Sequence, residues 1–435
     1  MPQNSFGGKL LEFPDIAVDK FNVDAKIFLL SHCHSDHLVG LANKSFQSTV
    51  YCSELTKQIF SLDNRNAPWL RYLRGIAFNS PFSIILNDKK VVLTLISAYH
   101  CPGSAMFLVE SEEKNVLFTG DIRAETWWTM GLKKNMYLFP YTCGFKSLDC
   151  IYLDTTFGYR REPYIEIPPN TDGIAAAIKM LSLYPTDDPD IEFFFADHTL
   201  GFEQAWSMIV SSLGGSMHMS NRILQRSVVV SKNPNCETYE SVLGHFDTNG
   251  GQKFHACEEG FCSQKVKFPV RIKQCINLNV IDFVGCLLPV DMKTLTDKGK
   301  QGIQVVDYTT KGNAIVRYRG RTWIQVNNEL LPSEIKLVFS RHSSYSECKE
   351  FVKTFNPVSV YPCVTSKGTW ENGFVMSRLF KDVCVSGGIE NFAFDVINCA
   401  THGIPISPIM VRPVKTINRW DLQDCENELR FVAKY

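Results

Sequence analysis

The densest group of metal-seeking side chains in this 435-residue sequence directly follows an apolar run. In "FLLSHCHSDHLVGL", residues 28–41, three histidines and one aspartate lie within six consecutive positions. Core packing needs no imidazoles at alternating positions, so a structural role does not explain the pattern. In an extended segment residues i and i+2 point the same way, so His32 and His34 can bind one ion together. Asp36 and His37 follow at the expected turn and can face a second ion.

Further metal-competent residues follow other predicted strands. His100 comes after "VVLTLISAY", Asp121 after "NVLFTG", Asp154 after "IYL" and His342 after "LVFSR". Loops at one edge of a sheet are where a fold collects such groups, so we expect these residues to converge on the first cluster. Two divalent ions about 3.5–4 Å apart can lower the pKa of a shared water towards 7 and hold phosphodiester oxygens. Imidazole and carboxylate ligands suit zinc best, with Mg²⁺ or Mn²⁺ as alternatives.

Composition sets limits on the partners and the compartment. Lys plus Arg and Asp plus Glu each total 45, so the formal net charge is zero. A zero net charge makes a nucleic-acid partner less expected but does not exclude one, because local basic patches set the affinity for phosphate. The 15 cysteines are an odd number without secreted-scaffold spacing, which favours a reducing compartment. The sequence has no signal-peptide pattern, and its longest apolar stretch, at 280–290, is too short to span a bilayer, so we expect an intracellular protein without a membrane partner.

The chain changes character after Phe157. Before it, short apolar runs between polar loops predict β-strands, namely "KIFLL", "VVLTLISA", "AMFLVE", "NVLFT" and "CIYLD". After it, "PPNTDGIAAAIKMLSLYP", "IEFFFAD" and "FEQAWSMIVSSLGG" alternate helix and strand character, which indicates an inserted α/β module. From Ile335, "IKLVFS" resumes the earlier pattern. We therefore predict a first domain over 1–157, an insertion over 158–334 and a return to the first domain within 335–435, without a role for 366–435.

Several motifs resemble those of a known family. "SHCHSDH", "HCPGSAMF", "TGDIR" and "LDTTF" look like the successive motifs of the metallo-β-lactamase fold. "HCPGSAMF", "LDTTF" and "RHSSYSE" resemble the β-CASP branch that contains the DNA cross-link repair nucleases, and "IAVDKF" is similar to its opening strand, with Asp19 at the acidic position. The resemblance covers residues 10–160 and 335–365. It implies an α/β fold, a metallo-β-lactamase αββα sandwich with an inserted β-CASP α/β domain.

Carried over to this sequence, the resemblance implies roles for individual residues. The first ion would be held by His32, His34, His100 and Asp121. The second would be held by Asp36, His37, bridging Asp121 and His342. Asp154 would orient a ligand histidine, and Asp36 would help to position the attacking water. Donors to a bound phosphate could come from Gly103, Ser104, Ser343 and Ser344. The alternative for the two serines after His342 is that they cap the following helix.

The insertion carries a second group of metal-competent residues. His218 in "SMHMS", His255 and Cys257 in "FHACEEG" and Cys275 in "IKQCIN" could close a tetrahedral structural zinc site. The Artemis subgroup of the family has such a site, and these positions match its order. Cys262 competes with Cys275 as the fourth ligand, and the alternative for the whole group is a buried histidine with free thiols.

A short basic segment offers a way to hold a nucleic-acid strand. In "VRYRGRTW", residues 316–323, Arg317, Arg319 and Arg321 alternate with other residues. On one strand they would share a face and could track a phosphate backbone while aromatic side chains stack on bases. An exposed charged strand without such a function is the alternative.

The resemblance implies a metal-dependent DNA nuclease that acts in the nucleus, in double-strand-break or interstrand cross-link repair. We expect endonuclease or 5′-exonuclease action on hairpins, overhangs and single-stranded ends by a monomer, leaving 5′-phosphate and 3′-hydroxyl ends. An RNA-processing β-CASP nuclease is the alternative. A small-molecule hydrolase is disfavoured by the large insertion, and a non-catalytic scaffold by the complete ligand set. Relatives recruit repair kinase and ligase partners through a long polar tail, and we make no prediction about such partners here.

Overall fold

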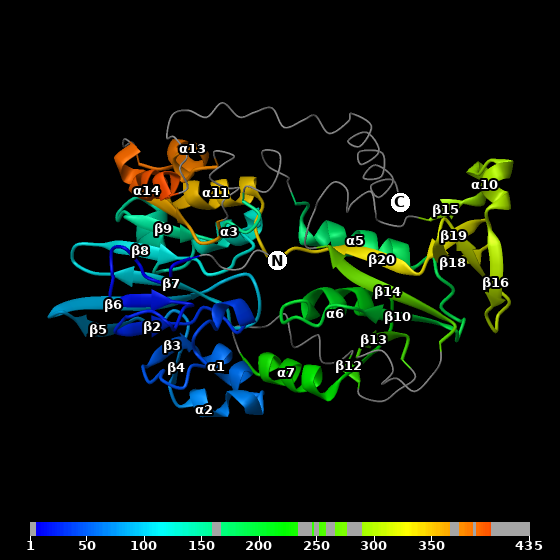
Figure 1. Cartoon of the computed structure of the whole chain (residues 1–435), viewed down its shortest axis with the longest axis horizontal. Coiled ribbons are helices and arrows are strands. Elements are labelled where there is room, and N and C mark those ends of the chain that lie inside the picture. The colour runs from blue at the N-terminus through cyan, green and yellow to red at the C-terminus, as the bar shows by residue number, and fades with distance from the viewer. Residues whose placement is uncertain are drawn as a thin grey trace. The chain divides into compact units, whose positions relative to one another are not determined.

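The computed structural model forms two compact units, which we describe separately (Figure 1). Unit 1 is drawn from the residues up to Ile167 and from Arg341 onward, and unit 2 from Pro168–Ser340. The structure describes residues 6–158, 167–233, 246–247, 252–257, 266–275, 289–365, 374–385 and 389–401. No helix in these ranges is long and apolar enough to cross a membrane.

The first sheet of unit 1 is a small parallel sheet at the N-terminal side of the chain. Its strands, in spatial order, are β1 (Ile16–Val18), β2 (Ile27–Leu29), β3 (Val50–Ser53) and β4 (Leu73–Ile76). Helix α1 (Glu54–Ser61) begins directly after β3, because the Ser53 side chain caps it by accepting the backbone N–H of Thr56 at 3.0 Å. Short α2 (Ala67–Leu70) completes this outer layer.

The second sheet of unit 1 has six strands. In spatial order they are β21 (Ser359–Pro362), β9 (Cys150–Leu153), β8 (Asn115–Phe118), β7 (Ala105–Glu110), β6 (Lys89–Ser97) and β5 (Phe82–Leu86). Strands β5 to β8 pair in antiparallel fashion, whereas β8, β9 and β21 are parallel. Parallel pairing at this edge brings the carboxyl ends of strands that are far apart in the sequence to one side.

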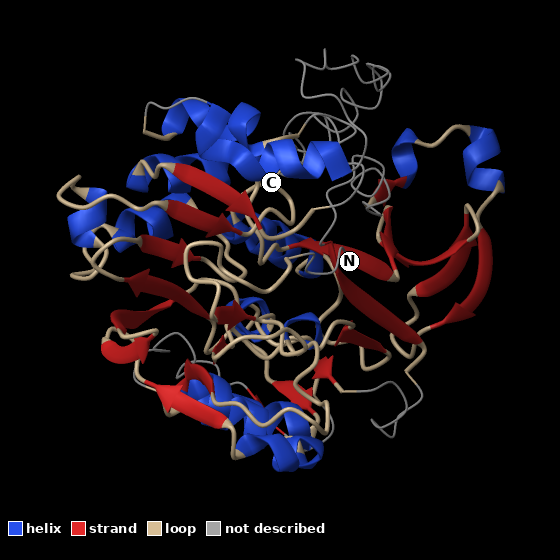
Figure 2. Cartoon of the chain, turned by 60° about the vertical axis from the view of Figure 1, so that its left-hand side comes forward, coloured by secondary structure: helices blue, strands red, loops and turns tan. Residues whose placement is uncertain are grey.

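Both faces of the six-stranded sheet are covered. On β6, Leu95 belongs to the core shared with the first sheet, and neighbouring Ile96 belongs to the core under the helices. The covering helices are α3 (Thr126–Leu132), α4 (Phe139–Thr142), α11 (Tyr345–Phe355), α13 (Met376–Phe380) and α14 (Ala393–Thr401). The layers run helix, sheet, sheet, helix in Figure 1, and the helices again lie over strands in Figure 2. The predicted αββα sandwich is confirmed.

Unit 2 is built on a parallel sheet of six strands. In spatial order they are β12 (Phe246–Asp247), β11 (Met217–Met219), β13 (Phe254–Ala256), β10 (Ile191–Phe195), β14 (Phe268–Cys275) and β20 (Glu334–Val338). The helices of this unit are α5 (Asn170–Leu181), α6 (Glu203–Ser212) and α7 (Asn221–Ser231). Trp206 of α6 is fully buried in the core with Phe195 at the end of β10. The alternation of helix and strand character after Phe157 thus corresponds to a real α/β unit.

One predicted boundary is wrong. We assigned the strand beginning near Ile335 to the returning first domain, because its sequence pattern matches the earlier strands. In the structure β20 pairs in parallel with β14, with Ile335 opposite Ile272, and therefore completes the sheet of unit 2. The return to unit 1 begins at Arg341. A strand's hydrophobic pattern shows that it is buried but does not identify its partner.

A second sheet in unit 2 was not predicted. Its strands, in spatial order, are β15 (Val290–Asp291), β19 (Glu329–Pro332), β18 (Arg321–Val326), β17 (Ala314–Tyr318) and β16 (Gln304–Tyr308), and α10 (Asp297–Gln301) precedes β16. The chain reverses between β17 and β18 at Arg319 and Gly320, whose φ angles are +49° and +71°. The prediction that Arg317, Arg319 and Arg321 share one face of a strand is therefore wrong, since Arg319 lies in the turn and Arg321 is opposite Tyr318 rather than Arg317.

Candidate metal centre

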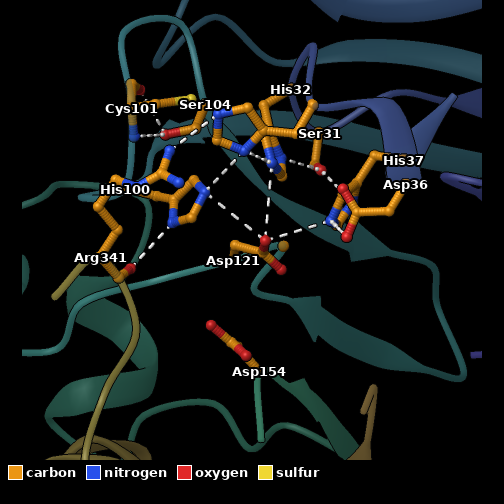
Figure 3. A network of polar contacts seen from close by, with 12 residues as sticks. Ser31, His32, Asp36, His37, His100, Cys101, Ser104, Asp121, Asp154 and Arg341 are labelled. Atoms are coloured by element: carbon orange, nitrogen blue, oxygen red, sulfur yellow. Dashed lines mark hydrogen bonds and ion pairs between the residues drawn. The ribbon is translucent and has the colours of Figure 1, made fainter. Parts of the chain in front are cut away.

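Histidines from three separate loops of unit 1 meet at one point (Figure 3). The Nδ1 atom of His34 lies 2.8 Å from Nε2 of His32 and 3.1 Å from Nε2 of His100. One ring N–H cannot point at both neighbours, so at most one of these two short contacts is an ordinary hydrogen bond. A cation that accepts a lone pair from each nitrogen satisfies all three rings. The donor set therefore fits a divalent metal ion.

Asp121, after β8, lies between two groups of histidines. Its Oδ2 atom is 3.6 Å from Nε2 of both His32 and His100, and 3.2 Å from Nε2 of His37. The ligand atoms of His100, Asp121 and His342 also lie within 4.8 Å of one another. The Asp121 carboxylate is thus within reach of both groups of histidines, and its bridging of two ions, which the family resemblance implies, stays a prediction.

Asp36 lies at the margin of this group. It belongs to the 3-10 turn η1 (Ser35–His37), and its Oδ2 atom is 3.6 Å from Nε2 of His37. Its side chain is 38% exposed, whereas that of His37 is 3% exposed. Of the predicted ligands, Asp36 therefore combines a position beside the centre with access from solvent.

Buried oxygens hold the far nitrogens of these rings. Nδ1 of His342 lies 2.8 Å from Oδ2 of Asp154, which also accepts the backbone N–H of Ile122 at 3.0 Å. Nδ1 of His100 donates to the backbone carbonyl of Arg341 at 2.9 Å. Each contact engages Nδ1 and turns Nε2 of the ring towards the centre, which is how protein groups behind a ligand orient it.

Asp19 also orients a ligand histidine, a role that its sequence position did not predict. Its Oδ2 atom lies 2.8 Å from Nδ1 of His37 and accepts the Ser31 hydroxyl at 2.6 Å. Ser31 Oγ in turn lies 2.9 Å from Nδ1 of His32. Asp19 is 2% exposed and has a φ of +55°, a left-handed conformation that Asp adopts more readily than most residues. Its position after the strand "IAV" was the available signal.

Burial and nearby charge divide the ring pKa values into two classes. Burial, together with the other imidazoles, lowers the pKa of His32 and His100 well below the usual value, so both rings are neutral and can donate a lone pair. Burial also acts to lower the pKa of His37, but Asp121 and Asp19 outweigh it and raise the pKa. Likewise Asp154 raises the pKa of His342 against the effect of burial.

The predicted phosphate donors are engaged in holding the loops together. Ser104 Oγ donates within its own loop, and the carbonyl of Gly103 accepts the hydroxyls of Ser53 and Thr56. Ser343 Oγ donates to the Ile122 carbonyl and accepts the N–H of Ala124, both at 2.8 Å. Ser344 is the N-cap residue of α11, where the Glu347 carboxylate accepts its backbone N–H at 2.8 Å. These contacts favour the capping alternative for Ser344, and phosphate binding by the four residues stays a prediction.

Arg123 and Cys101 were not selected from the sequence. Arg123 is fully buried, and its guanidinium lies 3.0 Å from a Glu347 oxygen and donates to the carbonyl of His342 at 3.4 Å. The Cys101 sulfur and the nearest ring nitrogens of His32, His34 and His100 all lie within 4.8 Å of one another. Cys101 directly follows the predicted ligand His100, and Arg123 lies two positions after Asp121. This closeness in sequence was the only indication of their position.

A second cluster lies in unit 2, on neighbouring parallel strands. The ligand atoms of His218, His255 and Cys257 lie within 4.8 Å of one another, and the Cys257 sulfur is 3.8 Å from Nδ1 of His255. His218 of β11 pairs with His255 of β13 in the register of the sheet. The donor set fits a zinc ion. The side chain of Cys275 and the whole of Cys262 lie outside the described residues, so the choice of a fourth ligand stays a prediction.

Comparison with known proteins points to DNA repair. The family model described as "DNA repair metallo-beta-lactamase" matches residues 325–368. Protein artemis of Homo sapiens is 28% identical over 406 residues, covering 88% of this chain and 52% of that protein. DNA cross-link repair 1A protein of Homo sapiens is 26% identical, covering 83% and 30%. DNA cross-link repair protein pso2/snm1 of Schizosaccharomyces pombe is 31% identical, covering 47% and 35%. The chain spans about half the length of the artemis proteins it matches.

Proposed function

We propose that this chain is a member of the DNA repair metallo-β-lactamase family and a metal-dependent nuclease that cuts phosphodiester bonds in DNA. The observation that carries this proposal is the position of Asp121, whose carboxylate reaches histidines on both sides of it. The RNA-processing alternative is not favoured, because the matching family model and two of the relatives are named for DNA repair. We take unit 2 to be the β-CASP insertion.

Each residue of the centre has a proposed role in binding metal or in orienting a ligand. We propose that one ion is held by His32, His34, His100 and Asp121 and the other by Asp36, His37, Asp121 and His342. When bound, the two ions supply Lewis acidity and activate water for in-line attack at phosphorus. Asp154 and Asp19 keep His342 and His37 in the tautomer whose Nε2 faces the centre.

We propose a role for Asp36 and the chemistry of the product ends. Because Asp36 is half exposed beside His37, we propose that it accepts a hydrogen bond from the attacking water and aligns it. We propose that the bond to the 3′ oxygen is the one that breaks, which leaves 5′-phosphate and 3′-hydroxyl ends. The substrates we propose are hairpins, overhangs and single-stranded ends, cut in the nucleus by a monomer.

We also propose the identity of the ions. Imidazole and carboxylate ligands favour zinc in the catalytic centre, with Mg²⁺ or Mn²⁺ as alternatives there. His218, His255 and Cys257 favour a separate structural zinc in unit 2. Elemental analysis of purified protein should then report more zinc than the catalytic residues alone can bind. After treatment with a mild chelator that abolishes activity, part of this zinc should remain bound to the protein.

A matched set of substrates tests the activity. Purified protein is incubated with a DNA hairpin, 5′-phosphorylated single-stranded DNA and RNA of the same sequence, beside an Asp36→Ala variant. We expect cleavage of DNA that is lost in the variant. Cleavage of RNA alone would support the RNA-processing alternative. Equal cleavage by the variant would contradict the assignment of the centre.

A further inference from the structure

Arg341 contacts two predicted ligands from two different loops. Its backbone carbonyl accepts the Nδ1–H of His100 at 2.9 Å, and its Nη1 atom lies 2.9 Å from Nε2 of His34. The residue is 6% exposed and directly precedes His342. Figure 3 shows its guanidinium on the same side of the centre as His100 and Cys101. A positive side chain is thus buried among residues that fit a cation.

The contact with His34 is incompatible with an ion on the same ring. Nδ1 of His34 faces Nε2 of His32 and of His100, so this nitrogen is the one that points into the centre. An imidazole that gives the Nδ1 lone pair to a metal carries its hydrogen on Nε2. Arginine has only donors. Two N–H groups would then face each other across the 2.9 Å contact, and the guanidinium has to leave it.

A phosphate group offers oxygens to the donor that Arg341 withdraws from His34. A guanidinium out of water is costly unless it is hydrogen-bonded, and its planar fork matches phosphate oxygens. The side chains first considered as phosphate donors, Ser104 and Ser343, are used inside the loops. We propose that Arg341 is a catalytic residue that leaves His34 when metal binds and donates to a non-bridging oxygen of the scissile phosphate. The inference rests on the proposed nuclease function.

Metal affinity without DNA tests the first half of the inference. The zinc affinity of the catalytic centre is measured by competition with a chromophoric chelator for wild type, Arg341→Ala and Arg341→Lys. Arg71→Ala serves as the control, because Arg71 is exposed and lies over Tyr72 in unit 1. Loss of a competing charged donor should tighten zinc binding in Arg341→Ala by about tenfold. Weaker binding would mean that Arg341 only supports the ligands, and would overturn the inference.

Cleavage kinetics test the second half. Removing one preorganised donor to a transition-state oxygen lowers kcat by about a hundredfold or more, so we expect this for Arg341→Ala with a smaller change in KM. Arg341→Lys should recover part of the rate and keeps the test informative if the alanine variant is unstable. Added guanidinium ion should restore activity to Arg341→Ala, whereas the same concentration of sodium should not. A kcat equal to that of wild type, or no restoration by guanidinium, would overturn the inference. Wild-type protein that cuts no DNA would contradict the proposed function itself, and with it the catalytic role of Arg341.

Discussion

Nε2 of His255 lies 3.0 Å from Oε2 of Glu192, on two adjacent strands of the sheet in unit 2. Both side chains are buried, and the ring of Phe194 stacks on His255 at 4.7 Å. The carboxylate lies beside one nitrogen of the ring, and the other, Nδ1, lies 3.8 Å from the Cys257 sulfur. This carboxylate–histidine arrangement is common behind protein zinc ligands.

Glu192→Ala should weaken zinc binding in unit 2. Loss of such an orienting carboxylate costs about 10–100-fold in metal affinity, and we expect an effect in this range. Zinc release is followed with a chromophoric chelator. Glu334→Ala is the control, because Glu334 lies in the same sheet but pairs with Lys273 at its exposed margin. Equal zinc affinity in the two variants would contradict the prediction that Glu192 orients His255 for zinc binding.

Asp154→Asn should weaken the catalytic centre without removing a ligand. Asp154 accepts hydrogen bonds from His342 and from the backbone of Ile122 and Thr156, so the amide loses charge and one acceptor. We expect metal affinity and DNA cleavage to fall together by about 10–100-fold. The matched control is Glu113→Gln, an exposed carboxylate paired with Lys89. Unchanged metal affinity in Asp154→Asn would mean that His342 needs no orienting partner.

Metal removal should lower the thermal stability of unit 1. A ligand that binds only the folded state at 100 times its Kd contributes about 2.7 kcal/mol. Chelation of wild type should therefore lower Tm, and added zinc should restore it. In Asp121→Ala the drop should be smaller, because Asp121 is shared by both ligand groups of the catalytic centre. An identical drop in wild type and variant would show that the stabilising ion is bound elsewhere.

His37 should give the metal-free protein a pH-dependent stability. Although burial opposes it, Asp121 and Asp19 raise the pKa of His37 above its unfolded value of about 6.5. The stability from protonated His37 is therefore fully present below about pH 6.5 and lost as pH rises through the folded-state pKa. In chelator, the Tm of wild type should exceed that of His37→Gln most at about pH 6, and the gap should narrow towards about pH 9. A gap that widens with pH would contradict this sign.

The sequence was most informative where chemistry and chain position coincide. The spacing of His32, His34 and His37 and the strands that precede His100 and Asp121 were enough to predict one centre, because strands that run in the same direction end at the same edge of a sheet. His218, His255 and Cys257 were grouped instead by their residue types and by the order of the zinc ligands in the family that the sequence resembles. In each case the ligand type and the local backbone carried the information.

Contacts between distant residues were not predictable in this way. Arg341 reaches His34 across 307 positions, and Asp154 reaches His342 across 188. The pairing of β20 with β14 was missed for the same reason, since one hydrophobic pattern suits several sheets. The hairpin at Arg319 was missed because alternating arginines were given more weight than the turn residue Gly320.

Two sets of hydrogen bonds, one in each unit, hold the two ends of the insertion. In unit 1, buried Arg123 donates to the carbonyl of Ile167, the last residue before the inserted segment, and to that of His342, the second residue after it. In unit 2, Asn170 and Ser340 exchange two hydrogen bonds of 2.9 Å. Within each unit, these hydrogen bonds hold together the residues at which the chain leaves and re-enters unit 1. An insertion held in this way can be replaced in evolution by one of different size. New substrate-binding surfaces can then arise while the metal ligands of unit 1 stay the same.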